Sequence, residues 1–166
     1  VERKRQWLKP GQSPIPTPLC VWWDVEGVIY WKLLPEKTTM TGTKYCNQLQ
    51  KLAEELHKKR KKQGKIYFQH DNARPHVADT VNKKLKQLNW ELVKHPPYSP
   101  DLAPSDYHLF LSLSNQIRGK KFKDEAELKM EIQKFFDSKS KDFYARGIYD
   151  LARRWQEVID TNGKYV

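Results

Sequence analysis

The stretch that decides the fold of this 166-residue chain is Lys65-Ile66-Tyr67-Phe68-Gln69-His70-Asp71-Asn72-Ala73-Arg74-Pro75-His76. Its first five residues form a largely apolar run that predicts a short β-strand over residues 65–69. The residues that follow cannot continue this strand, because Pro75 has no backbone N–H to donate. Asp71 therefore stands where a strand ends, the usual place for functional groups in an α/β sheet. Taken alone, an Asp-Asn pair here is better explained as a turn or as a cap for the next helix.

A second acidic residue follows a proline-rich loop in the segment Tyr98-Ser99-Pro100-Asp101-Leu102-Ala103-Pro104-Ser105-Asp106-Tyr107-His108-Leu109-Phe110. We predict Ser105 as the cap of a helix and Asp106 in its first turn, where the helix dipole favours an ionised side chain. Simple stabilisation of the helix start explains Asp106 equally well, and Asp101 reads as part of a turn. Together, a carboxylate at a strand end and one at a helix start are typical of metal-dependent phosphoryl-transfer sites.

The composition points to a polyanionic partner. The chain has 31 Lys and Arg against 20 Asp and Glu, a formal net charge of +11 and a pI near 9.6. Nucleic acid is the leading candidate for such a charge, and a merely soluble basic domain is the alternative. Cys20 and Cys46 form no disulfide framework, which fits a reducing compartment. The sequence has no apolar run of the ~20 residues that a membrane helix needs.

The order of the predicted elements indicates an α/β fold. Strands are predicted at 19–23 and 28–34 around a hairpin turn at 24–27, and a helix with Thr41 or Thr43 as its cap follows over 45–56. A strand at 66–69, a helix at 77–88 and a strand at 91–93 come next. Helices then begin at 106 and near Asp124, where Glu127 completes a capping box, and the last one ends near Asn162-Gly163. This order predicts one mixed central sheet flanked by helices, with a helical C-terminal part.

The two acidic segments, taken with three further ones, resemble mariner transposases of the Tc1/mariner superfamily. The further segments are Leu19-Cys20-Val21-Trp22-Trp23-Asp24, Phe143-Tyr144-Ala145-Arg146-Gly147-Ile148 and Arg154-Trp155-Gln156. The resemblance covers essentially all of residues 1–166, which we therefore expect to form a single catalytic domain. It implies an RNase H-like fold in which three acidic residues bind two divalent metal ions, normally Mg²⁺, with Mn²⁺ as a substitute. By motif, Asp71 matches the second of these catalytic, metal-binding residues and Asp106 the third.

The same resemblance implies an activity and its partners. Mariner transposases cut DNA at the inverted-repeat ends of the transposon and join the free ends to target DNA. The partners implied are therefore transposon ends and target DNA, with a homodimer for the intact protein and a location in the nucleus. The alternative that we keep is an inactive or domesticated module, derived from a transposase, that binds DNA without cutting it.

The chain departs from the family at its N-terminal side. The first catalytic Asp of the family lies on the first strand of the sheet, and no segment here matches that strand. The only acid before Lys9 is Glu2, and Asp24 belongs to a motif that matches a later strand. The family's helix-turn-helix region has no match either. Because the chain starts at Val1 rather than Met, we expect it to be a piece of a longer protein. Because the first catalytic Asp has no match, we expect this chain not to cleave DNA by itself.

Basic residues near these segments are candidates for DNA contact. Arg74, beside Asp71, is assigned with equal weight to a DNA phosphate or to a neighbouring carboxylate. Two further groups of basic residues either form a solvated surface or contact the phosphate backbone of DNA. The first group is Lys58, Lys59, Arg60, Lys61 and Lys62, and the second is Arg118, Lys120 and Lys121. No spacing of Cys and His matches a zinc site, so we expect His76 and His108 to support the acidic site or to pack beside it.

Overall fold

The computed structural model describes residues 19–35, 38–60 and 64–164, and within them four strands form two separate pairs. β1 (Leu19–Asp24) and β2 (Gly27–Leu33) form an antiparallel hairpin. β3 (Ile66–Gln69) lies parallel to β4 (Trp90–Val93). A parallel pair cannot be joined by a tight turn, and α2 (Asp79–Gln87) supplies the crossover between β3 and β4.

The hairpin turn forms where the sequence predicts it. The Asp24 carboxylate accepts a hydrogen bond from the Glu26 N–H at 2.9 Å, which closes the turn locally. Gly27 then adopts a φ of +129°, a conformation that side chains with a Cβ rarely reach. This short, locally satisfied turn fixes β2 directly beside β1.

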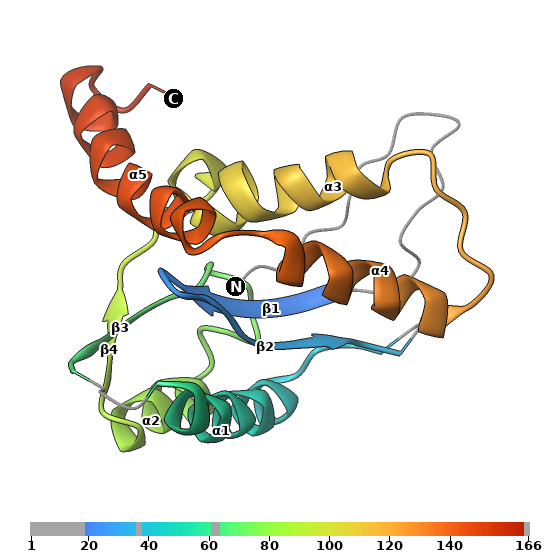
Figure 1. Cartoon of the computed structure of the whole chain (residues 1–166). Helices are drawn as coiled ribbons and strands as arrows, with labels where there is room; N and C mark the ends of the chain where they lie inside the picture. The colour runs from blue at the N-terminus through green and yellow to red at the C-terminus, as the bar shows by residue number, and fades with distance from the viewer. Residues whose placement is uncertain (1–18, 36–37, 61–63, 165–166) are drawn as a thin grey trace.

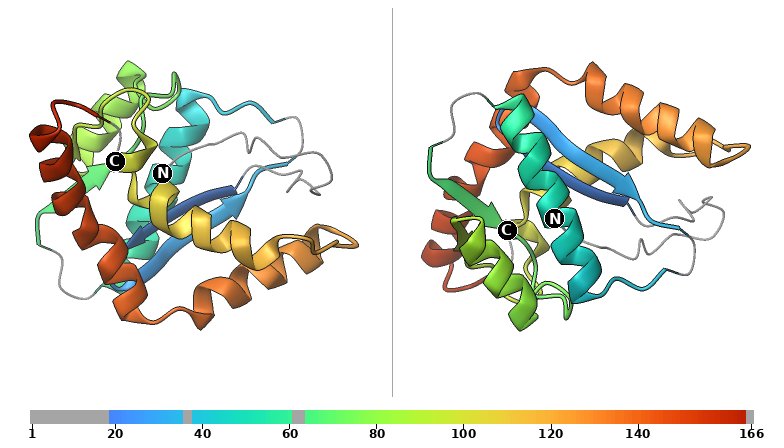
Figure 2. Two further views of the ribbon diagram at one scale, coloured as in Figure 1. Left: turned by 90° about the horizontal axis from the view of Figure 1, so that it is seen from above. Right: turned by 90° about the horizontal axis from the view of Figure 1, so that it is seen from below.

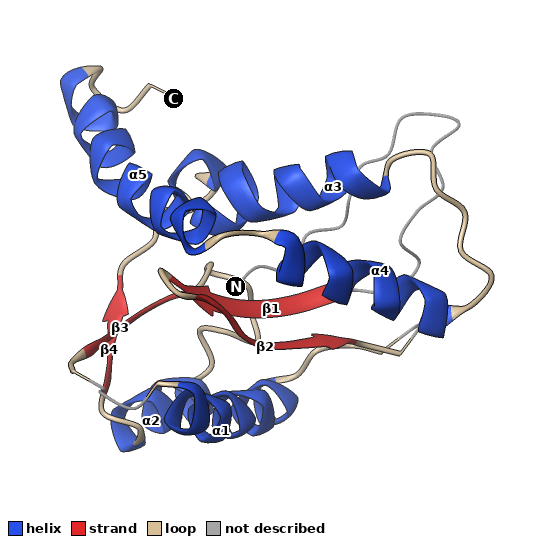
Figure 3. Ribbon diagram, viewed as in Figure 1, coloured by secondary structure: helices blue, strands red, loops and turns tan. Residues whose placement is uncertain are grey.

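Two layers of helices enclose the strands (Figures 1 and 3). α1 (Gly42–Lys59) and α2 lie on one side. On the other side lie the short η1 (Pro100–Leu102), the π-helical η2 (Ser105–Phe110), α3 (Leu111–Ile117), α4 (Glu125–Ser138) and α5 (Lys141–Asp160). Views from above and from below show the same separation (Figure 2).

Alternate side chains of β1 serve the two sides of the strand layer. Trp22 joins a buried cluster with Tyr45 and Leu49 of α1, whereas Val21 joins a second cluster with Ile132 of α4. Successive side chains of a strand point to opposite faces. β1 therefore carries a hydrophobic core on each face and holds the two helical layers together.

Most local signals predict the helix ends correctly. Thr41 caps α1 by accepting a hydrogen bond from Lys44 N–H at 3.3 Å, and Asp124 caps α4 by accepting one from Glu127 N–H at 2.8 Å. α5 ends at Asp160, just before Asn162 and Gly163, whose φ angles are both positive. These caps need only neighbouring residues, which is why the sequence alone identifies them.

Two predictions change in detail. The antiparallel and the parallel pair that a mixed sheet requires are both present, but no strand pairing joins β1 to β3 within the described part of the chain. Ser105 was predicted as a helix cap, and this is wrong. Pro104 occupies the cap position, and the Ser105 hydroxyl instead accepts a hydrogen bond from the Trp23 indole at 3.0 Å. The Ser105 hydroxyl thus bonds to Trp23, 82 positions away in sequence, rather than to the backbone of its own helix.

Some predictions lie outside the described residues. Residues 1–8, where the sequence also allows an edge strand ending at Trp7-Leu8, fall in that part of the chain. So do residues 13–18, where three prolines predict an extended loop, and Lys61 and Lys62. In the described residues, no helix is both long enough and apolar enough to cross a membrane.

Candidate metal centre

Asp71 lies two residues beyond the end of β3, in a partly buried position with a side chain that is 16% exposed. Its Oδ1 atom accepts hydrogen bonds from the Ala73 N–H at 3.0 Å and from His76 Nδ1 at 2.5 Å. Burial raises the pKa of the Asp71 carboxyl, but these hydrogen bonds and the charge of His76 act in the opposite direction and leave it below its ordinary value. The side chain is therefore ionised near neutral pH, which is the form that binds a cation.

A buried cluster of aromatic side chains holds His76 in place. The His76 ring stacks on His70, with ring centres 5.3 Å apart, and packs on Tyr45 at 4.2 Å. The Tyr45 hydroxyl shares a hydrogen bond with His70 Nδ1 at 3.1 Å. Burial lowers the pKa of His70 to about 3 and raises that of Tyr45 well above its usual range, so both groups are neutral near pH 7. Tyr45, His70 and His76 thus form a buried, hydrogen-bonded cluster behind Asp71.

Sequence reasoning anticipated part of this support. The expectation that His76 supports the acidic site agrees with its contact to Asp71. Tyr45 begins the helix predicted over residues 45–56, as one of the apolar positions that define its buried face. Its position on α1, 25 residues before His70, carries no local signal for a polar contact.

Asp106 lies in the first turn of η2, as predicted, and its N–H donates to the Ala103 carbonyl at 2.8 Å. A π-helical turn is rare and is frequently found at functional sites. Contacts with α5 fix this turn, since Tyr107 donates its hydroxyl proton to the Gly147 carbonyl at 2.7 Å and His108 Nε2 bonds to the Phe143 carbonyl at 2.8 Å.

The close approach of η2 to α5 requires a glycine. A Cβ atom placed on Gly147 would lie 2.4 Å from the His108 ring and 2.9 Å from the Trp23 indole. The segment around Phe143 and the segment around Asp106 therefore meet in space. His108, expected to support or pack beside the site, packs against Phe143 with ring centres 4.2 Å apart.

Hydrogen bonds also tie the end of β3 to the loop that precedes Asp106. The Gln69 amide donates to the Leu102 carbonyl at 3.1 Å. Gln69 lies two residues before Asp71, and Leu102 lies four residues before Asp106. The Asn72 amide, next to Asp71, donates to the His95 carbonyl at 2.8 Å. The two acidic segments are therefore neighbours. Over the described ranges, no three His, Cys, Asp or Glu side chains are grouped so that they could hold a metal ion.

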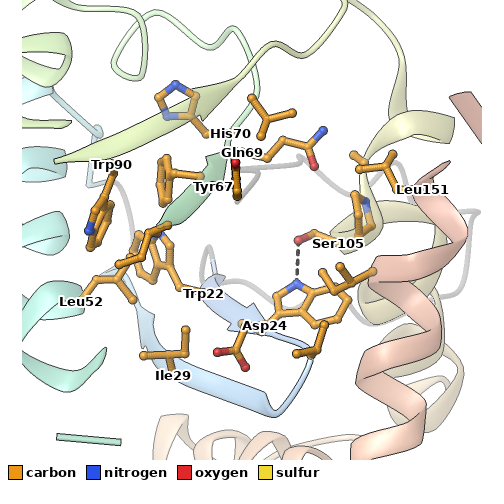
Figure 4. A pocket seen from close by; sticks show the side chains of 18 of the residues that line it. Trp22, Asp24, Ile29, Leu52, Tyr67, Gln69, His70, Trp90, Ser105 and Leu151 are labelled. Carbon is orange, nitrogen blue, oxygen red and sulfur yellow. Dashed lines mark hydrogen bonds between the residues drawn. The ribbon is translucent and has the colours of Figure 1, made fainter. Parts of the chain in front are cut away.

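A cavity of about 510 Å³ opens beside this region, between β1 and β3 (Figure 4). Its wall includes residues 22–25 from β1 and the turn, residues 65–71 from β3 and its ends, and residues 103–105 from the loop and the start of η2. Asp71 lies on this wall, and so does Ser105, the neighbour of Asp106. Most of the remaining wall is apolar, from Ile29, Leu52, Trp90 and Leu151.

The described residues of the basic run at the end of α1, which are Lys58, Lys59 and Arg60, all have contacts within the molecule. Lys58 pairs with Glu55 at 2.8 Å, and Lys59 donates to the Ile29 carbonyl at 2.7 Å. The Arg60 guanidinium binds both carboxylate oxygens of Asp24, at 2.7 and 2.8 Å, and is only 14% exposed. The contacts of Lys59 and Arg60 fasten α1 to the hairpin, and Arg60 gives Asp24 a structural partner.

The other basic candidates lie at the surface. Arg74 is exposed in the turn after Asp71. Arg118, Lys120 and Lys121 are exposed between α3 and α4, where Arg118 donates to the Asn115 side chain and Lys120 pairs with Glu131.

Comparison with known proteins places the chain in a family. Residues 1–66 match the family described as Transposase (partial DDE domain). The chain is 40% identical over 179 aligned positions to the mariner Mos1 transposase of Drosophila mauritiana, covering 99% of this chain and 52% of that protein. It is 38% identical over 177 positions to the histone-lysine N-methyltransferase SETMAR of Homo sapiens, covering 98% of this chain and 26% of that protein.

Solved structures show the same similarity. The crystal structure of the catalytic domain of Mos1 transposase superimposes with a TM-score of 0.87 at 43% identity, covering 90% of this chain and 76% of that one. The Mos1 paired-end complex with Mg superimposes with a TM-score of 0.88 at 40% identity, covering 99% and 52%. The fold is the RNase H-like fold of transposase catalytic domains.

The chain belongs to the mariner transposase family. It spans about half the length of Mos1 transposase and about a quarter of SETMAR.

Proposed function

We propose that this chain forms part of the catalytic domain of a mariner-type transposase, which cleaves DNA at transposon ends and transfers the strands into target DNA. The observation that carries the proposal is the joining of the two acidic motifs through Gln69 and Leu102. The overall similarity to the Mos1 catalytic domain supports it. Such an enzyme acts on chromosomal DNA, so we propose the nucleus as its location.

Asp71 and Asp106 are the proposed catalytic, metal-binding residues. Carboxylates are the hard oxygen ligands that Mg²⁺ and Mn²⁺ prefer. When bound, such ions stabilise the charge that develops on the attacking and leaving oxygens of a phosphodiester. In this chain, Asp71 is ionised and its Oδ1 is fixed by Ala73 and His76. Contacts to α5 fix the π-helical turn that carries Asp106. The fixed Asp71 carboxylate and the fixed turn that carries Asp106 both suit a site that holds metal ions in a defined position.

DNA contact is proposed for the exposed basic side chains. Arg74 lies beside Asp71, and a second basic group surrounds the start of the loop between α3 and α4. Lys59 and Arg60 already have partners within the fold, so we assign their main role to the attachment of α1. Phosphate contacts of this kind release counterions from DNA, so the affinity falls steeply as the salt concentration rises.

A second candidate is a module that binds DNA without cutting it. One observation favours it. A relative of this chain, human SETMAR, carries the name of a histone-lysine methyltransferase, so this domain also occurs in proteins named for another activity.

Nicking of supercoiled plasmid DNA in the presence of Mn²⁺ separates the two candidates. We expect the chain to bind DNA but to leave the plasmid intact, because loss of one metal-binding carboxylate typically costs several orders of magnitude in rate. Fusing a family-like strand with its Asp to the N-terminus should restore nicking. In that fusion, Asp71→Ala and Asp106→Ala should each abolish nicking, whereas the exposed control Asp142→Asn should not. Equal nicking by all four proteins would place the catalytic residues elsewhere.

A further inference from the structure

The segment Arg154-Trp155-Gln156 is one of those that resemble the mariner family, yet it stands far along the chain from both acidic residues. It lies on α5, which contacts both η1 and η2. Figure 1 shows α5 lying across the yellow-green segment that leads into α3. The Arg154 side chain is only 19% exposed. A charged group that is mostly buried needs partners within the fold, and these partners define what Arg154 does.

The Arg154 guanidinium makes three contacts with three different elements. Its Nε donates to the Asp150 carboxylate of α5 at 2.7 Å, and its Nη1 donates to the Asp101 carbonyl of η1 at 3.4 Å. Its central carbon lies 4.0 Å from the centre of the Tyr107 ring of η2. A guanidinium is planar, so it can stack on a ring with its face while it donates hydrogen bonds from its edge. Arg154 therefore connects η1 and η2 to each other and to α5.

The contact with Tyr107 bears directly on Asp106, the preceding residue. The Tyr107 hydroxyl donates to the Gly147 carbonyl of α5 at 2.7 Å, which fixes the tip of the ring. The stacked guanidinium of Arg154 holds the same ring by its face. Because both contacts come from α5, they fix the orientation of the π-helical turn that carries Asp106.

The contact with η1 leads to the other acidic residue. Two consecutive carbonyls of η1 are bonded to two different elements. The Asp101 carbonyl accepts from Arg154 of α5, whereas the Leu102 carbonyl accepts from the Gln69 amide at the end of β3. Gln69 lies two residues before Asp71. Through η1, Arg154 is thus linked to the strand end that carries Asp71.

We propose that Arg154 is a positioning residue that sets the place of Asp106 relative to Asp71. It acts through Tyr107 and through η1, and not as a metal ligand, because a guanidinium has no acceptor atom to offer a cation. Lysine cannot take over this role, since its ammonium is a compact charge on a flexible stem without a planar fork. The proposal rests on the proposed function, in which Asp71 and Asp106 bind metal ions.

The neighbouring residue provides a matched control. Arg153 also binds the Asp150 carboxylate, at 2.7 Å, and its other partner is Glu157, at 2.7 Å. Both partners lie on α5, and the Arg153 side chain is 59% exposed. Arg153→Lys and Arg154→Lys each keep the positive charge on the same helix. A comparison of the two variants therefore separates the connection between elements from the simple stabilisation of α5.

Amide hydrogen exchange tests the connection without any metal ion. In the full 166-residue chain, Arg154→Lys should make the amides of residues 105–110 exchange at least about tenfold faster, because local opening of η2 becomes easier. Exchange in α4 should stay unchanged. Arg153→Lys should exchange like the wild type in both segments. Circular dichroism verifies that both variants are folded.

Calorimetric titration with Mn²⁺ tests the effect on the metal site, at a temperature at which both variants are folded. Arg154→Lys should bind Mn²⁺ about tenfold more weakly, at the lower end of the loss typical for groups that orient metal ligands. Arg153→Lys should bind like the wild type. In Arg154→Ala, millimolar guanidinium should restore both slow exchange and Mn²⁺ affinity, whereas methylammonium should not. A contact that only stabilises the fold would lower the melting temperature and leave the Mn²⁺ affinity of the folded protein unchanged.

Two results would overturn the role of Arg154. One is equal exchange of residues 105–110 in Arg154→Lys and Arg153→Lys. The other is an unchanged Mn²⁺ affinity in Arg154→Lys when Asp106→Ala weakens Mn²⁺ binding. If Asp71→Ala and Asp106→Ala both bind Mn²⁺ like the wild type, the metal site of the proposed function fails instead. The exchange rates and their rescue by guanidinium then decide by themselves whether Arg154 fixes the turn.

Discussion

Replacing His76 tests whether the buried cluster behind Asp71 prepares that carboxylate for a metal ion. The Asp71 Oδ1 atom has two hydrogen-bond donors, the Ala73 N–H and His76 Nδ1. His76→Phe keeps an aromatic ring in the cluster but removes one of the two. We therefore expect a carboxylate that is less well oriented, with little change in the apolar packing around it.

The size of the effect follows from the kind of bond that is lost. The His76 side chain is 4% exposed and Asp71 16%, so water replaces the missing donor poorly. A hydrogen bond to a charged group contributes about 1.5–3 kcal/mol. Loss of a group that orients a metal ligand typically weakens metal binding about 10–100-fold, or roughly 1.4–2.8 kcal/mol. The two magnitudes agree.

Isothermal titration calorimetry with Mn²⁺ measures this directly. We expect about 10–100-fold weaker binding for His76→Phe and a smaller loss for His76→Asn, whose amide can still donate a proton. His57→Asn is the matched control, because His57 is exposed on α1. If His76→Phe binds Mn²⁺ as tightly as the control does, the cluster does not prepare Asp71 and our reasoning is refuted.

Three further predictions concern stability. The folded-state pKa of His70 is about 3, below that of the unfolded chain, so unfolding takes up a proton below about pH 6.5. The free energy of unfolding should therefore fall from about pH 6.5 towards pH 3, by up to about 1.4 kcal/mol per pH unit. Urea titrations of His70→Gln should show a shallower fall with pH, and an unchanged dependence on pH contradicts this. A double-mutant cycle of Asp24→Ala and Arg60→Ala should give a coupling of about 1–2 kcal/mol, because the pair is bidentate and partly buried; a value near zero would make the contact incidental. Gly147→Ala should lower the melting temperature through its clash with His108, at a cost of about 1–3 kcal/mol, and a higher melting temperature would mean that η2 does not press on α5.

Local sequence patterns determined the elements of this protein. Thr41 and Asp124 cap helices through neighbours three residues away, and the apolar run before Asp71 predicted β3 to within one residue of its observed bounds. The placement of Asp71 at a strand end and of Asp106 in a first turn followed from the same local rules. Such features depend on backbone geometry over a few residues, so the sequence carries them in full. The family motifs also lie in short segments, and they indicated the fold before any contact was known.

The tertiary structure decided which partners these side chains have. The local pattern predicts Ser105 as a cap, but its hydroxyl accepts a hydrogen bond from the Trp23 indole. Arg60 belongs to a basic run that gives no local sign of a partner, and the fold pairs it with Asp24. Tyr45 reads as one more core residue until folding brings its hydroxyl to His70. The separation of β1 from β3 is likewise visible only in three dimensions. Each of these outcomes is a competition between groups far apart in sequence, and the winner is set by packing, burial and distance, which no local pattern contains.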